Sequence, residues 1–281
     1  MSNDGKPKYV LWPYTPSIAA GIIATLVFLA LTSVHTWRLV RNRTWFCIPF
    51  VIGGLCETIG YAARAAGTDS VPSNLAHNDT DSKTPYIIQS TLILVAPILF
   101  AASVYMILGR LILRTGSASY SIVRATWVTK IFVAGDILCF MIQGGGAGLL
   151  VSSSDADGFK RGENIILGGL ILQIMIFAFF VLVAGIWHRR LSARPTGAAA
   201  ELPWKKYIIF LYGASVCITV RNVCRVIEYA MGKEGYLLSH EWPLYVYDFL
   251  PMVITLAVCV TWYDPNIKPG RKTDIEIGMR H

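Results

Sequence analysis

The chain has 281 residues, of which 54% are hydrophobic and only 15% are charged, and its mean hydropathy is +0.52. A soluble domain usually carries about 25% charged residues, so this composition excludes an ordinary water-soluble protein. The net charge of +8 reflects where the basic residues lie along the chain, as shown below, and gives no support to nucleic-acid binding.

Seven apolar runs follow one another along the chain, and each offers the roughly 20 residues that a helix needs to cross about 30 Å of hydrocarbon. The alternating pattern of an outer-membrane barrel is missing. The sequence therefore predicts an all-α, polytopic membrane protein with seven transmembrane helices. We place these spans near residues 15–37, 45–66, 86–109, 131–152, 164–187, 207–231 and 242–263.

The basic residues predict an orientation. With the N-terminus outside, 16 of the 25 Lys and Arg residues fall in inner segments and six in outer segments. Inner loops of membrane proteins carry such an excess, so we expect an extracellular tail over 1–14, a transmembrane domain over 15–263 and a cytosolic tail over 264–281. The outer loop also contains the sequon Asn78-Asp79-Thr80, which predicts glycosylation of Asn78.

Glycine and proline predict local irregularity within the spans. Gly144 and Gly148 form a GxxxG pair, which favours a close approach of two helix backbones. Pro97 and Pro251 are expected to interrupt the third and seventh spans, either as simple kinks or to free carbonyls around a cavity. All six cysteines lie within spans and are expected to be small packing residues.

Polar side chains inside the spans fall on narrow stripes. The second and sixth spans each carry three of them at i, i+4 and i+7, which places each set on one helix face. Charged groups are expensive in hydrocarbon, so these stripes should face the bundle interior. Gln173 of the fifth span adds to them. The candidate substrate-binding residues are Glu57, Tyr61, Arg64, Gln89, Asp136, Gln143, Arg221, Arg225, Glu228, Glu241 and Asp248.

The charges inside the spans do not balance. Four acids (Glu57, Asp136, Glu228 and Asp248) accompany three arginines. Either one acid is protonated or a cation completes the site. The stripes predict a polar cavity in the outer half, with a thinner connection inward past Gln143 and Asp136. A structural network, with pairs such as Arg225 with Asp248 or Arg64 with Glu57, is the alternative interpretation.

Seven pieces of sequence, in this order, resemble a known family. They are "YTPSIAAGIIATLVFLALTSVHTW", "GGLCETIGYAAR", "IIQSTLILVAPILFAASVYMILGRLI", "FVAGDILCFMIQGGGAG", "GGLILQIMIFAFFV", "RNVCRVIEYAMGKEGYLLSHEWPLYVYDFLPM" and the closing "DP". They cover roughly residues 14–265, and the chain resembles the fungal seven-span RTA-like family, also called lipid-translocating exporters. The resemblance implies a multi-pass plasma-membrane or endomembrane protein. It also implies export or flipping of sphingoid bases, resistance to toxic amphiphiles or, in another branch, porphyrin or haem uptake.

The expected function is therefore transport of an amphiphilic lipid, with a sphingoid long-chain base first and with membrane lipids and an amphiphilic small molecule as partners. The amine of the sphingoid base would bind the surplus acid, one of Glu57, Glu228 and Asp248. The sequence contains no Walker-type motif, so movement would be passive or driven by protons through a carboxyl such as Asp136. No enzymatic activity and no cofactor are expected. A receptor or sensor, and haem binding through His35 or His240, are the alternatives.

Overall fold

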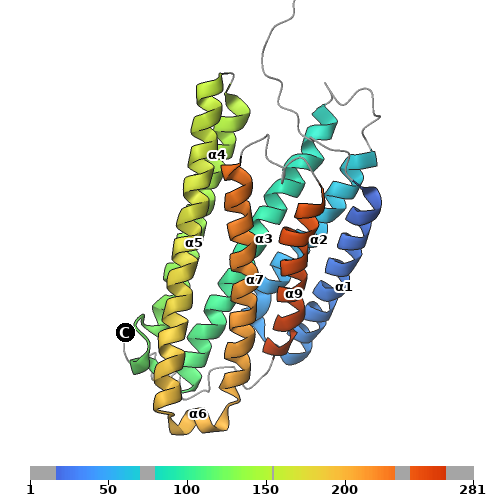
Figure 1. Ribbon diagram of the computed structural model, residues 1–281. Coiled ribbons are helices and arrows are strands. Elements are labelled where there is room, and N and C mark those ends of the chain that lie inside the picture. The colour runs from blue at the N-terminus through green and yellow to red at the C-terminus, as the bar shows by residue number, and fades with distance from the viewer. Residues whose placement is uncertain (1–16, 70–79, 154, 232–240, 264–281) are drawn as a thin grey trace, which may run out of the picture.

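The computed structural model describes residues 17–69, 80–153, 155–231 and 241–263, which form a bundle of long helices (Figure 1). Seven described helices are long and apolar enough to cross a membrane, which confirms the predicted fold class. Asn78 and both predicted tails lie outside the described residues. The elements are α1 (Ile18–Asn42), η1 (Trp45–Cys47), α2 (Ile48–Asp69), α3 (Thr80–Arg114), η2 (Ala118–Tyr120), α4 (Ala125–Ser152), α5 (Ala156–Ala193), α6 (Gly197–Glu201), α7 (Trp204–Ala230), the π-helical turn η3 (Leu244–Phe249), α9 (Leu250–Cys259) and η4 (Val260–Trp262).

Helix α3 is the central element of the bundle. It packs against α2 and α4, its neighbours along the chain, and also against α7. Of its most apolar stretch, 72% of the residues are buried, the largest share among the seven spans. Figure 1 shows α1 and α2 on one side of the bundle and α4 and α5 on the other. Polar groups that project from these helices toward α3 are consequently shielded from lipid.

The outer faces of the bundle carry large apolar side chains. Ile23 and Leu26 of α1 are 59% and 57% exposed, Met141 of α4 is 60% exposed, and Ile209 of α7 is 63% exposed. A water-soluble monomer rarely exposes so continuous an apolar surface. Each of these helices therefore turns its apolar side chains toward lipid and its polar stripe toward the interior of the bundle.

The ends of α1 follow from its local sequence. The Ser17 hydroxyl accepts a hydrogen bond from the backbone N–H of Ala20, which satisfies one of the unpaired donors of the first turn. At the other end Arg43 adopts a left-handed conformation, with φ of 50°, and its N–H donates to the carbonyls of Leu39 and Val40. The helix therefore stops at Asn42 and the chain turns into η1.

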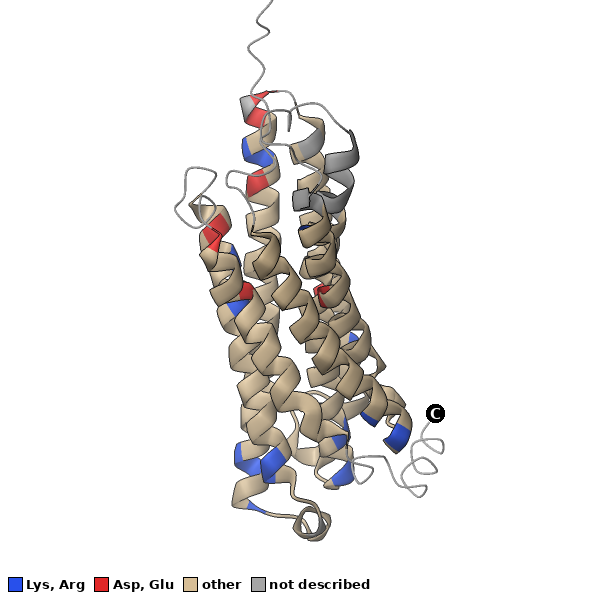
Figure 2. Ribbon diagram, turned by 90° about the vertical axis from the view of Figure 1, so that its right-hand side faces the viewer, with Lys and Arg blue, Asp and Glu red and all other residues tan. Residues whose placement is uncertain are grey.

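Buried polar contacts join the helices at the end of the bundle where α6 lies. The Trp187 indole donates to the Ser117 hydroxyl at 2.8 Å. The two ring nitrogens of His35 lie 2.9 Å from the Tyr263 hydroxyl and 2.9 Å from the Leu256 carbonyl oxygen. Figure 2 shows Lys and Arg gathered at this same end. The pattern agrees with the charge asymmetry in the sequence.

The two prolines, Pro97 and Pro251, differ in their effect on helix continuity. Helix α3 runs without a break from Thr80 to Arg114, so the predicted break at Pro97 is wrong, but the proline does free a carbonyl, that of Ile93, as expected. Proline removes only one helical hydrogen bond, and the tightly packed neighbours of α3 hold the helix on both sides of it. The seventh span is irregular as predicted, because η3 is a π-helical turn and Pro251 stands in the first turn of α9.

The GxxxG prediction is wrong in its choice of residues. A Cβ added at Gly144 or Gly148 would meet nothing within 4 Å, so neither glycine lies at a close helix contact. The close approach of α4 and α5 occurs at Gly146, where an added Cβ would lie 2.9 Å from the Gly162 carbonyl oxygen. The i, i+4 spacing identified the correct segment, but the orientation of α4 selects the glycine between the two.

We expect Gly146→Ala to destabilise the protein by about 1–3 kcal/mol, because the new methyl group would force α4 and α5 apart. Gly144→Ala is the matched control, since it has open space and gains up to about 1 kcal/mol of helix propensity. Thermal unfolding in detergent, followed by tryptophan fluorescence, measures the difference. Equal melting temperatures for the two variants would contradict this packing.

Candidate functional site

The candidate site is built around Asp248, on the π-helical turn η3. Its two carboxylate oxygens each receive a different arginine of α7: Arg221 Nε donates to Oδ1, and Arg225 Nη2 donates to Oδ2 at 2.5 Å. The Asp248 and Arg221 side chains are 5% and 4% exposed. Because 221 and 225 are one helical turn apart, both guanidinium groups reach the same carboxylate. The predicted pair of Arg225 with Asp248 is confirmed.

Pro97 contributes to this site through its missing N–H group. In a regular helix the Ile93 carbonyl would accept a hydrogen bond from residue 97, which proline cannot donate. Arg221 Nη2 donates to that carbonyl at 2.8 Å instead. The proline therefore leaves α3 unbroken and still frees a carbonyl, which fixes Arg221 between α3 and η3.

Two further ion pairs extend the site. Arg225 Nη1 donates to Glu228 Oε2 at 3.1 Å, and these two side chains are 18% and 27% exposed. Arg64 Nη2 donates to Glu241 Oε1 at 2.8 Å, so Arg64 is paired with Glu241 instead of the predicted Glu57. Glu241 also accepts the Ser17 N–H at 2.9 Å and thereby ties the start of α1 to α2.

Glu57 is the acid of this site that has no ion-pair partner among the described residues. It is 1% exposed, its Oε1 has no hydrogen-bond partner among the described residues, and it takes part in none of their ion pairs. It lies within electrostatic range of Asp248, Arg221 and Arg225. The connected site thus holds four acids (Glu57, Glu228, Glu241 and Asp248) against three arginines (Arg64, Arg221 and Arg225), which leaves one acid of the described residues without a basic partner.

Two neutral polar groups, one on α2 and one on the adjacent α3, are also unpartnered among the described residues. The Tyr61 hydroxyl, one turn along α2, is fully buried among Phe28, Tyr245 and Phe249. Gln89 on α3 is 6% exposed and its Oε1 has no partner. Buried polar atoms in native proteins nearly always find a partner, so this group of acceptors is typical of a site that binds a donor.

The remaining predicted residues make their contacts elsewhere. Asp136 accepts a hydrogen bond from the Tyr105 hydroxyl of α3 at 2.8 Å, and Gln143 donates to the Gln173 side chain of α5 at 2.9 Å. Because Glu241, which the sequence count left out, pairs with Arg64, two acids instead of one have no arginine: Glu57 and Asp136. Sequence reasoning missed Tyr105 and Tyr245, because a tyrosine in a span gives no signal of its own.

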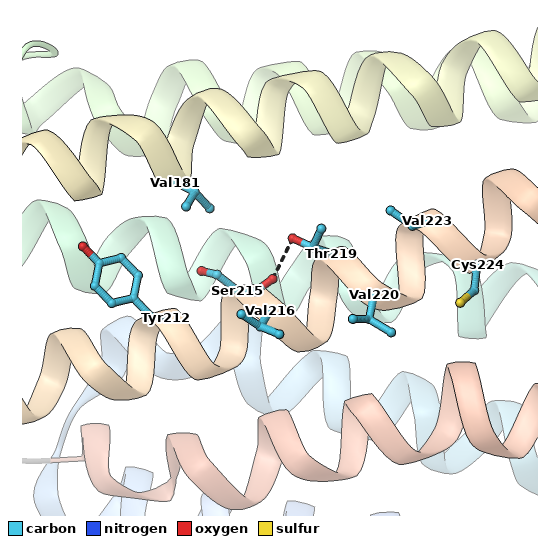
Figure 3. Close-up of a pocket in the computed structure, with 8 residues that line it drawn as sticks. All are labelled: Val181, Tyr212, Ser215, Val216, Thr219, Val220, Val223 and Cys224. Carbon is cyan, nitrogen blue, oxygen red and sulfur yellow. Dashed lines mark hydrogen bonds between the residues drawn. The ribbon is translucent and has the colours of Figure 1, made fainter.

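Apolar residues line two grooves on the described surface. The larger, about 490 Å³, lies between α5 and α7 and is shown in Figure 3. Thr219 within it and Arg221 point about 160° apart around α7, so the groove and the arginine stripe occupy opposite faces. The second groove, about 310 Å³, lies between α4 and α5. The groove between α5 and α7 is lined by Val181, Tyr212, Ser215, Val216, Thr219, Val220, Val223 and Cys224. Neither groove is lined by any candidate residue, and the predicted polar cavity stays a prediction.

His35 does not fit the role of a haem ligand. Both of its ring nitrogens are engaged, one by the Tyr263 hydroxyl and the other by the Leu256 carbonyl oxygen. It is fully buried, and its ring packs against Phe50. Coordination of iron would break one of these hydrogen bonds. The other predicted ligand, His240, lies outside the described residues.

A known protein family matches most of the chain. The model of the family described as "RTA1 like protein" matches residues 50–270, which run from the first turn of α2 past η4. The chain belongs to the RTA1-like family. This membership confirms the resemblance in the sequence, and the seven apolar helices make the chain a multi-pass membrane protein.

Three yeast relatives, all from Saccharomyces cerevisiae, illustrate the range of the RTA1-like family. Protoporphyrin uptake protein 1 is 31% identical, over 88% of this chain and 90% of the relative. Protein RTA1 is 30% identical, over 92% and 86%. Sphingoid long-chain base transporter RSB1 is 22% identical, over 95% and 76%. No solved structure matches the chain. Two of these names describe membrane transport of lipid-like compounds.

Asp248→Asn should lower the free energy of unfolding by about 3–5 kcal/mol, because it leaves the buried Arg221 and the partly buried Arg225 without their shared carboxylate. Glu228→Gln serves as the control, since its ion pair is partly exposed and should contribute no more than about 1 kcal/mol. Thermal unfolding of both variants in detergent provides the measurement. A melting temperature for Asp248→Asn equal to that of Glu228→Gln would show that Asp248 does not hold the site together.

Proposed function

We propose that the protein translocates amphiphilic lipids with a cationic head group across the plasma membrane or an endomembrane, without enzymatic chemistry. A sphingoid long-chain base is the leading substrate. Support comes from the relative named as a transporter of such bases and from the general transport activity in the names of two relatives. In the proposed route the chain of the amphiphile stays in lipid while its head group passes between the helices.

The unmatched carboxylate of Glu57 is the observation that carries this proposal. An ammonium head group supplies one positive charge and several N–H donors, as the lysine ammonium does. In the proposed complex it binds Glu57 Oε1 and neutralises the surplus charge, with the Tyr61 hydroxyl and Gln89 Oε1 as further acceptors. The cost of holding a buried acid without a partner is thereby offset only when substrate is bound.

The arginines have a positioning role in this proposal. Arg221 and Arg225 are committed to Asp248, so they hold η3 against α7 and shape the electrostatic field around Glu57. Glu228, Glu241 and Arg225 are the more exposed members of the site. We therefore propose that substrate reaches Glu57 from their end of the bundle.

The topology completes the proposal. The end of the bundle with α6, where Figure 2 shows the basic residues concentrated, is proposed to face the cytosol. The end with Arg225, Glu228 and Glu241 then faces outward. This supports an N-out, C-in orientation, with the Glu57 site reached from the exoplasmic leaflet.

Glu57→Gln should abolish transport of a fluorescent sphingoid-base analogue into liposomes while leaving the protein folded. Because the substitution replaces a buried acid without a partner by a neutral amide, we expect stability to stay equal or rise by about 1–3 kcal/mol. Glu163→Gln makes the same chemical change on α5, outside the site, and should transport at the wild-type rate. Wild-type rates for Glu57→Gln, or equal rates with protein and with empty vesicles, would refute the proposal.

Arg225→Ala and Glu228→Gln should also abolish transport, with the protein still inserted in the membrane. Arg225 links Asp248 to Glu228, so either change alters the proposed route to Glu57. The same liposome assay measures the rate, and membrane fractionation confirms insertion. Full activity in both variants would assign these residues to the scaffold alone.

Porphyrin uptake is the second candidate function, because a relative at 31% identity is named as a protoporphyrin uptake protein. A porphyrin carries carboxylates, which arginines bind well. Our proposal predicts that purified protein mixed with haem or protoporphyrin shows no saturable change in the Soret band. A saturable change that is lost in Arg225→Ala would favour the porphyrin.

A further inference from the structure

A second buried acid, Asp136, lies apart from the Glu57 site. It is on α4 and is 1% exposed, and its one hydrogen bond within the described residues comes from the Tyr105 hydroxyl, which donates to Oδ2 at 2.8 Å. Its other oxygen, Oδ1, is buried and has no partner among those residues. The mechanism proposed above gives this group no role.

The hydrogen-bond partner of Asp136 belongs to an aromatic group. Tyr105 of α3 is itself fully buried, and its ring centroid lies 4.5 Å from that of Phe180 and 5.4 Å from that of Phe132. Phe177 of α5 completes this group of rings at 6.1 Å. Tyr105 thus joins Asp136 to this aromatic group, and the other oxygen of Asp136 is buried without a partner among the described residues.

No positive charge compensates Asp136 within the described part of the chain. It takes part in none of the ion pairs there, all of which involve Arg64, Arg221 or Arg225. The titratable groups that face it are Tyr105 from α3 and Cys139 from its own helix, while α5 contributes phenylalanines. A carboxylate with one hydrogen bond and no counter-charge is very unfavourable in such a place.

We propose that Asp136 is a proton-binding site: its carboxyl carries an exchangeable proton on Oδ1, and Tyr105 positions it by donating to Oδ2. The reaction is the gain or loss of one proton between this carboxyl and water, and no other bond changes. In the neutral acid the charge that lacks a partner disappears. The ionised form requires water to reach α4, so proton release accompanies an opening between α3, α4 and α5. This site goes beyond the proposed lipid transport and does not depend on it.

The test is infrared spectroscopy of the full protein in liposomes, with no substrate present. We expect a protonated-carboxyl C=O band at neutral pH that shifts in D₂O, is lost when the pH is raised, and is absent in Asp136→Asn. Tyr105→Phe removes the hydrogen bond to the carbonyl oxygen, so the band should move to higher frequency in that variant. Glu57→Gln should leave the Asp136 band in place, which separates the two acids.

Absence of any band that depends on Asp136 would overturn the proposal. So would a band that neither D₂O nor alkaline pH alters, because a purely structural acid keeps its proton. If Asp136→Asn does not fold, Tyr105→Phe still decides: an unshifted carboxyl band in that variant would also contradict the assignment. None of these outcomes depends on lipid transport. The experiment can therefore refute the proton-binding site without refuting the transport function, and the reverse also holds.

Discussion

The structure depends on one carboxylate that two arginines share. Asp248 joins η3 to α7 through Arg221 and Arg225, and Arg221 extends the connection to α3 through the Ile93 carbonyl. Each of these groups is strongly unfavourable alone in a low-dielectric interior, and each becomes tolerable only with its partners in place. The seventh span thereby has a fixed depth and rotation against the central helix, which apolar packing alone would not specify.

These ion pairs determine which acid of the site stays available to bind a substrate. Because Asp248 satisfies two arginines and Glu241 satisfies the third, Glu57 stays buried without a cation. A protein selected for stability alone would carry a neutral residue there, since the change should cost nothing or stabilise the fold. Functional sites commonly keep such locally unfavourable groups. The retained acid is therefore the feature that favours binding of a cationic head group.

Much of this could be predicted from sequence, and the physical reasons are specific. Seven spans follow from hydrophobic length, and the inward direction of the Arg221 and Glu57 stripes follows from helical periodicity and the cost of charge in lipid. The pairing of Arg64 with Glu241 could not be predicted, because it depends on how α2 is rotated against the segment before η3. The same holds for Gly146, where helix orientation decides which glycine of the segment touches α5, and for the separation of Asp136 from Glu57.

The central claim is that Glu57 is the cation-binding acid of the RTA1-like bundle. An experimental structure of the protein with a sphingoid long-chain base bound tests it most directly. The account predicts head-group density in contact with the Glu57 carboxylate, and Arg221 and Arg225 still on Asp248. Head-group density remote from Glu57, or an arginine moved onto Glu57 with no ligand beside it, would contradict the account.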